Sequence, residues 1–280
     1  MSMISRVLPK NKHTMGVSMH SLVRRVPMAL GPVLGGLLIG WYGETGGVRL
    51  AFMIALALAV VSLVFQQWMI EDGGRQQRET EANPLRLLAK LSPPLRQLLL
   101  SDILVRFCEQ IPYAFVVLWC VKNVGVTPFQ FGLLTAIEMA TAMLIYIPVA
   151  YWADKGEKKP FVVITFGFFT IFPLVLLFAR SFWLLAGAFV IRGLKEFGEP
   201  TRKALIMDLA PEGQKAATFG AYYLARDLIV SLAAFGGAYL WSLSPATNFL
   251  SASAFGLIGM ILFAVFGRDT AAPLPASVNS

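Results

Sequence analysis

The sequence predicts an all-α membrane protein with eight transmembrane helices and both termini in the cytoplasm. Eight apolar stretches take up most of its 280 residues, and each has about the length of roughly 20 residues that a helix needs to cross a bilayer. Hydrophobic residues make up 56% of the chain and charged residues only 14%, a balance that would be abnormal for a soluble domain. The basic residues of the connections also fall almost entirely on one side of an even number of spans.

The spans differ in how cleanly the sequence marks them. Leu50 to Ile70 is the clearest, because no charged residue interrupts it. The other seven are expected at Val17–Gly40, Leu98–Val121, Phe129–Ala153, Phe161–Ala179, Phe182–Gly198, Ala216–Trp241 and Phe249–Phe266.

Positive charge sets the expected orientation. With both termini inside, only Arg49, Lys122 and Arg180 fall in outer connections, as expected when cytoplasmic loops retain lysine and arginine. The net charge of +8 therefore reflects membrane topology. It does not indicate a nucleic-acid partner, and the expected partner is the lipid bilayer.

The longest connection, residues 71–97, is the one candidate linker. It starts with an acidic, glycine-containing stretch and ends at two prolines. Pro84 suits the first turn of a short helix, in which Leu85, Leu88 and Leu91 would share one side. Such a helix would lie along the inner membrane surface, and a disordered loop is the alternative.

The chain also contains a weak internal repeat. Arg25 precedes the pair Gly35-Gly36 by the same distance at which Arg226 precedes Gly236-Gly237. Parallel repeats of this kind are typical of transporter halves.

Several motifs resemble those of the major facilitator superfamily, whose members have two six-helix halves joined by a cytoplasmic loop. The run Gly31-Pro32-Val33-Leu34-Gly35-Gly36 is similar to the core of the family's fifth-helix antiporter motif. Residues 154–159, which begin with Asp154, resemble the second-half copy of its Asp-Arg-x-Gly-Arg-Lys loop, with Glu157 in the usual place of the glycine. Arg192 occupies the place of an arginine on the family's tenth helix.

The resemblance divides the chain into three parts. Residues 1–70 would be the last two helices of an N-terminal bundle, residues 71–97 the cytoplasmic interdomain linker, and residues 98–280 a six-helix C-terminal bundle with a short cytoplasmic tail. The first four helices of a complete family member have no counterpart, so the resemblance implies an N-terminally truncated protein.

It also implies a function. The expected protein is a secondary transporter that exports a small organic solute in exchange for protons, by alternating access, in a bacterial cytoplasmic (inner) membrane. The alternative is a transport-inactive remnant that acts as a membrane scaffold or partner subunit, with a second chain supplying the missing helices.

Charged residues inside the spans are candidates for the substrate and proton sites, because a charge at the bilayer centre costs about 2.5–3.5 kcal/mol. Asp102, Arg106 and Glu109 recur at helical spacing and share one face. Glu109 lies about 17 Å from the inner edge of its span and so near the midplane. The alternative is a self-neutralising pair of Arg106 and Glu109 that only fixes packing.

Glu138 is a further candidate, because it lies at mid-depth with no cation within a helical turn on its own helix. Burial favours the neutral carboxylic acid, so Glu138 could exchange protons during transport. A permanently protonated glutamate that is hydrogen-bonded to a neighbour is the competing interpretation.

A third group of charges is expected at the cytoplasmic side. In the family such charges form an inner latch whose ion pairs break when the cavity opens inward. The candidates for this gating network are Asp154, Arg192, Glu196, Glu199, Arg226 and Asp227.

The motif Gly31, Pro32, Gly35 and Gly36 has two interpretations. Small residues four positions apart let helices approach closely, so the motif can serve helix packing. A direct part in ion coupling is the alternative.

The sequence offers little for other functions. It has no His-Glu-x-x-His or Gly-x-Ser-x-Gly motif, so we expect no enzyme. Its two histidines, His13 and His20, lack neighbouring ligands for a metal site, and no cofactor is expected.

Overall fold

The computed structural model describes residues 13–69, 84–89, 91–211 and 213–269. Every regular element in these ranges is a helix, as the predicted fold class requires. The helices are α2 (His13–Met69), α3 (Pro84–Ala89), α4 (Pro93–Gln110), α5 (Tyr113–Leu118), the π-helical turn η2 (Trp119–Val124), α6 (Pro128–Lys155), α7 (Lys159–Phe178), α8 (Phe182–Leu194), α9 (Glu199–Leu209), α10 (Lys215–Ser231), α11 (Ala233–Leu243) and α12 (Pro245–Phe266).

Six stretches of the described residues are long and apolar enough to cross a membrane, compared with eight predicted spans. Two local features account for the difference. Ser21–Trp68 is a single stretch because the first two predicted spans are joined without a loop. The predicted span 182–198 is interrupted, since α8 ends at Leu194 and α9 begins only at Glu199.

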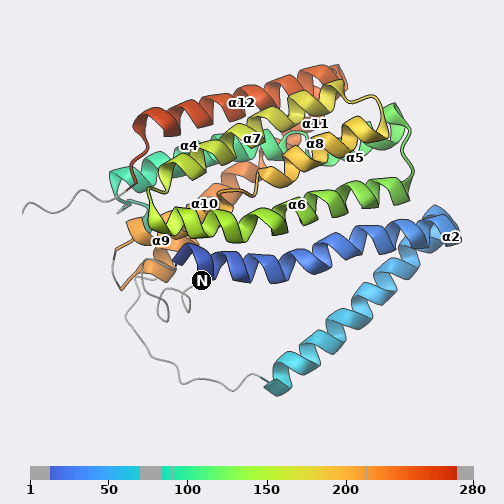
Figure 1. Ribbon diagram of the computed structural model, residues 1–280, viewed down its shortest axis with the longest axis horizontal. Coiled ribbons are helices and arrows are strands. Elements are labelled where there is room, and N and C mark those ends of the chain that lie inside the picture. Colours follow the sequence, from blue (N-terminus) through green and yellow to red (C-terminus); the bar gives the residue numbers. More distant parts are fainter. Residues whose placement is uncertain (1–12, 70–83, 90, 212, 270–280) are drawn as a thin grey trace, which may run out of the picture.

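Two glycines make the bend inside α2. Gly43 has a φ of 73° and a ψ of 172°, a conformation that costs glycine little. A Cβ atom on Gly47 would lie 2.5 Å from the Cα of Ile39, so only a glycine allows the two halves to approach this closely. Figure 1 shows the first half of α2 running beside α6 and the second half diverging from the bundle.

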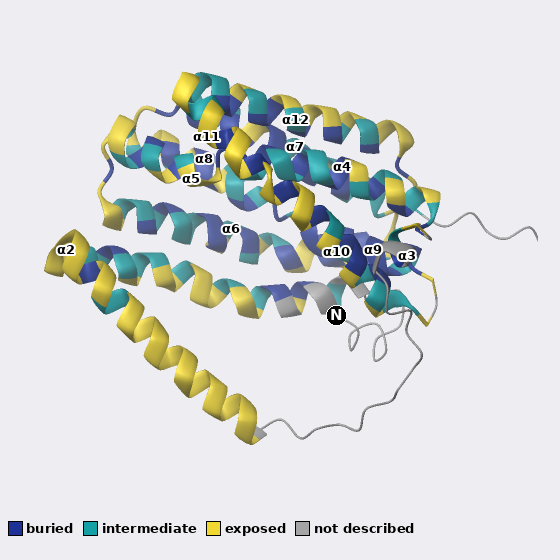
Figure 2. Cartoon of the chain, turned by 180° about the vertical axis from the view of Figure 1, so that it is seen from behind, coloured by how far each residue is buried: buried dark blue, intermediate teal, exposed yellow. Residues whose placement is uncertain are grey.

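The second half of α2 is the most exposed part of the described chain (Figure 2). Large apolar side chains such as Phe52, Leu58 and Trp68 are exposed along its length. A helix that is apolar all round suits a lipid environment, which is consistent with the predicted span 50–70.

The other described helices form a bundle whose centre is packed through small residues. The helix α12 lies against both α4 and α7. A Cβ atom on Gly259 would lie 2.8 Å from the carbonyl oxygen of Ser101, and one on Gly256 would lie 2.9 Å from the sulfur of Cys108. Close backbone approach of this kind stabilises helix contacts in lipid, where burial of apolar surface adds little.

The expected short helix of the linker is present as α3. It lies against α10, and Leu88 and Leu91 pack with the apolar core of the bundle. The helix therefore contacts protein along this side. Residues 71–83 and residue 90 of the predicted linker lie outside the described residues. Its last residues, from Pro93, form the start of α4.

Only part of the predicted glycine motif lies at a helix contact. A Cβ atom on Gly36 would lie 2.8 Å from the Cα of Phe129, at the start of α6, and one on Gly132 would lie 2.6 Å from the carbonyl oxygen of Pro32. Gly31 and Gly35 have no such neighbour within 4 Å. The crossing of α2 and α6 therefore depends on Gly36 and its counterpart Gly132.

Candidate functional site

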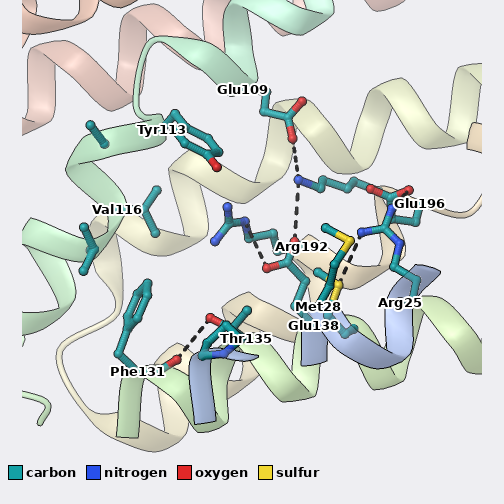
Figure 3. A pocket seen from close by; sticks show the side chains of 15 residues that line it. Arg25, Met28, Glu109, Tyr113, Val116, Phe131, Thr135, Glu138, Arg192 and Glu196 are labelled. Atoms are coloured by element: carbon teal, nitrogen blue, oxygen red, sulfur yellow. Dashed lines mark hydrogen bonds and ion pairs between the residues drawn. The ribbon is translucent and has the colours of Figure 1, made fainter. Parts of the chain in front are cut away.

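A cavity of about 690 Å³ lies between α2 and the bundle, which is large enough for a small organic molecule. Its walls come from α2, α4, α5, α6, α8 and the turn after α8. Three cationic and three anionic side chains line it, as Figure 3 shows in part: Arg25, Arg192, Lys195, Glu109, Glu138 and Glu196.

The break between α4 and α5 places Glu109 at this cavity. The helix α4 ends at Gln110, and Pro112 caps the start of α5, so the helix is interrupted just after Glu109. One of the freed carbonyl groups, that of Ile111, accepts a hydrogen bond from the Nδ2 of Asn248 at 3.4 Å. Glu109 therefore sits on the last turn of α4 and faces the cavity.

Lys195 connects the two carboxylates that were predicted as separate candidates. Its Nζ lies 2.6 Å from the Oε1 of Glu109 and 3.6 Å from the Oε1 of Glu138. Gly193 lets α8 approach α6 at this level, since a Cβ atom there would lie 2.5 Å from the carbonyl oxygen of Glu138. The structure thus brings Glu109 and Glu138 into one site.

The surroundings of Glu138 differ from the sequence-based interpretation, which considered only its own helix. Arg192 of α8 places its Nε 3.4 Å from the Oε2 of Glu138, in addition to the contact with Lys195. Glu138 is 3% exposed, so these two cations are its neutralising partners. The sequence could not reveal them, because they lie more than 50 positions away along the chain.

A second set of contacts joins α2 to the bundle at the cavity wall. Arg25 lies 2.5 Å from the carboxylate of Glu196 and donates a hydrogen bond of 3.0 Å to the hydroxyl of Tyr146. The Tyr146 hydroxyl also lies 3.1 Å from the Oε2 of Glu196. Arg25 was not among the predicted site residues, although the internal repeat marks its position.

Further ion pairs continue from the cavity through the bundle. Arg106 contacts Glu109 at 2.6 Å and Glu199 at 2.7 Å, so the predicted pair exists but is not isolated. Glu199 in turn lies 2.7 Å from Arg202. Arg202 also contacts Asp102.

This chain of pairs ends on α10. Arg226 lies 3.4 Å from Asp102 and 2.7 Å from Asp227. We call the complete run the charge ladder; it consists of Arg192, Glu138, Lys195, Glu109, Arg106, Glu199, Arg202, Asp102, Arg226 and Asp227. Positive and negative residues alternate along it.

Arg202 was not among the predicted site residues. It follows the predicted span 182–198, lies on α9 and is 1% exposed. Its spacing from Glu199 matches the i, i+3 pairing of a helix. That spacing is the sequence signal that could have identified Arg202 as the partner of Glu199.

The six residues predicted as one gating network fall in different places. Arg192 and Glu196 line the cavity, Glu199 lies inside the charge ladder, and Arg226 and Asp227 form its end. Asp154 accepts a hydrogen bond of 2.9 Å from the backbone N–H of Met15, in the first turn of α2. Its carboxylate therefore faces the positive end of that helix.

The described residues offer no group of three or more metal-ligating side chains. Each carboxylate of the cavity contacts a lysine or an arginine.

Two comparisons with known proteins bear on the family. The family model described as Major Facilitator Superfamily matches residues 98–279. A curated protein of Deinococcus radiodurans, described as "Putative sugar efflux transporter", is 32% identical over 69 residues, which are 24% of this chain. The match covers 18% of the length of that relative.

Proposed function

Because the chain belongs to the Major Facilitator Superfamily, we propose that it moves a small organic solute across a membrane by alternating access. The six candidate spans among its described residues make it an integral multi-pass membrane protein. The observation that carries the proposal is the cavity of about 690 Å³ lined by three cations and three carboxylates. Ionisable side chains inside a membrane protein are costly and typically mark substrate or ion pathways.

Proton coupling is proposed to act through Glu138. Its contacts with Arg192 and Lys195 measure 3.4 Å and 3.6 Å, longer than the 2.6 Å between Lys195 and Glu109. The ion pairs of Glu138 should therefore break more easily than the ion pair between Lys195 and Glu109. Protonation of Glu138 would release both cations and alter the charge that a solute meets.

The direction of transport and the membrane rest on analogy. The Deinococcus radiodurans relative is described as an efflux protein and comes from a bacterium. Export through a bacterial cytoplasmic membrane is accordingly the proposed role.

Reconstitution tests this function directly. Purified protein in proteoliposomes, with a pH-sensitive dye inside and an imposed pH gradient, is exposed to lactose, 2-naphthalenesulfonate or 2-naphthylmethylamine. At least one of these neutral, anionic and cationic probes should drive proton movement. The Glu138→Gln variant should abolish the coupled flux because it cannot ionise, whereas Glu44→Gln, at the exposed bend of α2, should leave it unchanged.

The outcome also separates the proposal from its alternative. Uncoupled transport by the wild type, or coupling that persists in Glu138→Gln, removes Glu138 from the mechanism. Absence of protein-dependent flux for every probe supports the second candidate, a non-transporting scaffold or partner subunit. The exposed apolar second half of α2 is the observation that favours this candidate.

A further inference from the structure

Arg192 is the cavity cation with the fewest polar contacts. Lys195 contacts two carboxylates, and Arg25 contacts Glu196, Tyr146 and the sulfur of Met139. The closest approach of Arg192 to Glu138 is from its Nε, at 3.4 Å. Among the described residues, its two terminal nitrogens make no hydrogen bond.

The guanidinium of Arg192 is nevertheless held in place. Its central carbon lies 5.3 Å from the ring centres of both Phe172 and Phe189, which is within the range of cation–π attraction. Figure 3 shows the group pointing into the cavity, toward Tyr113 and Val116. A cation that is fixed in this way and has free N–H groups is prepared to receive an oxyanion.

Tyr113 adds a second polar group at the same place. Its hydroxyl points toward the guanidinium of Arg192 in Figure 3, and it has no hydrogen-bond partner in the described part of the chain. A tyrosine hydroxyl can donate a hydrogen bond to an anion. Arg192 and Tyr113 therefore offer converging donors from α8 and α5.

The wall beside these donors is apolar. Residues of α2, α5 and α6 form it, namely Met28, Pro32, Ala114, Val116, Val117 and Phe131. A solute bound there would bury an aliphatic or aromatic body against this wall.

The three carboxylates of the cavity, unlike Arg192, are already engaged by several partners within the protein. Glu109 contacts Lys195 and Arg106, Glu138 contacts Arg192 and Lys195, and Glu196 contacts Arg25 and the Tyr146 hydroxyl. A cationic solute would have to displace an existing partner. An anion would meet donors that the protein leaves unused.

We propose that Arg192 and Tyr113 bind the oxyanion of an amphipathic organic anion, whose apolar body lies against Val116 and Phe131. This inference rests on the proposed function in treating the cavity as a solute site, and it names the class of solute. Sugars would leave the apolar wall unused, so they are expected to bind more weakly than such anions.

Equilibrium binding to the intact chain in lipid nanodiscs tests the inference without requiring transport. The probes are 2-naphthalenesulfonate and 2-naphthoate, each compared with its neutral amide, together with lactose. At least one anion should bind about tenfold or more tightly than its amide, because hydrogen bonds to charged groups contribute most. Competition between that anion and a labelled copy shows that binding is saturable.

Variants assign the donors. Arg192→Gln should reduce affinity for the anion about tenfold or more while leaving the amide unaffected. Arg192→Lys should fall between wild type and Arg192→Gln, since a lysine keeps the charge but loses the planar, bidentate geometry. Tyr113→Phe should weaken anion binding several-fold, and Arg24→Gln, at an exposed position of α2, should have no effect.

The results separate this inference from the proposed function. Equal affinity for anions and amides, tighter binding of lactose, or anion binding that Arg192→Lys and Tyr113→Phe leave unchanged would each overturn it. Anion binding through Arg192 without transport would support it and refute the carrier function. Transport of a probe at a rate that Arg192→Gln leaves unchanged would support the carrier function and refute anion binding by Arg192.

Discussion

Asp102 shows at the scale of a single residue how this bundle tolerates buried charge. It is 0% exposed, and it contacts Arg202, the Tyr222 hydroxyl at 3.1 Å and Arg226 at 3.4 Å. An unpaired carboxylate would be very costly at this depth. Alternation of sign along the charge ladder gives each buried member at least one partner of opposite charge.

Arg226 contacts two carboxylates, Asp102 and Asp227. Removing Asp102 should destabilise the protein far more than removing Asp227. Asp102→Ala leaves a buried arginine without its main partner, and such changes cost about 3–5 kcal/mol. Asp227→Ala should have little effect, because the Asp227 side chain is 61% exposed. Thermal unfolding of both variants in detergent checks this, and equal losses of stability would contradict it.

At the scale of helices, glycines decide where two elements can meet. The sequence motif contains Gly31, Gly35 and Gly36 without distinguishing them, whereas only at Gly36 would an added Cβ atom lie within 4 Å of the α6 backbone. Which of the three glycines faces α6 depends on the rotation of α2 about its axis. The presence of small residues does not fix that rotation. The repeat mate Gly237 likewise lies close to the backbone of Ile111, while Gly236 has no such neighbour.

Gly36→Ala should consequently weaken the packing of α2 on α6, by about 1–3 kcal/mol as for other overpacked sites. Gly35→Ala is the matched control, since it brings the same gain in helix propensity but no contact. The measurement is the thermal stability of each variant, together with the rate at which a protease separates α2 from the bundle. Similar behaviour of the two variants would show that this crossing is not tight.

At the scale of the whole molecule, α2 is attached to the bundle at three levels. The backbone of Met15 contacts Asp154, Arg25 contacts Glu196, and Gly36 packs on Phe129. The contact between Asp154 and Met15 pairs a carboxylate with the start of α2. Such an arrangement contributes about 0.3–1 kcal/mol to stability. It is the one most suited to opening and closing in the proposed transport cycle.

Asp154→Asn should shift the population toward forms that are open at this end, by roughly two- to fivefold, because the charge is lost while a hydrogen-bond acceptor remains. Ser18 is 1% exposed on α2, so a Ser18→Cys reporter should react faster with an impermeant maleimide in the variant. Both native cysteines are buried and add only a slow background. Glu157→Gln, just beyond the end of α6, serves as control. Unchanged labelling in Asp154→Asn would exclude the latch.

The sequence by itself determined the helical, membrane-spanning character of this protein and the stripe of Asp102, Arg106 and Glu109. These follow from local physics, since the hydropathy of about 20 residues decides their partition into lipid and helical spacing decides which side chains share a face. The break at Pro112 is local in the same way.

Only the tertiary structure decided which charges meet. Glu138 carries no partner on its own helix, and the distance to Arg192 depends on how closely Gly193 lets α8 approach α6. Arg202 follows a predicted span in the sequence, and only the packing of α9 places it against Asp102. Ion pairs between helices depend on the rotation, depth and tilt of each helix, which packing of the whole bundle sets and no single segment encodes.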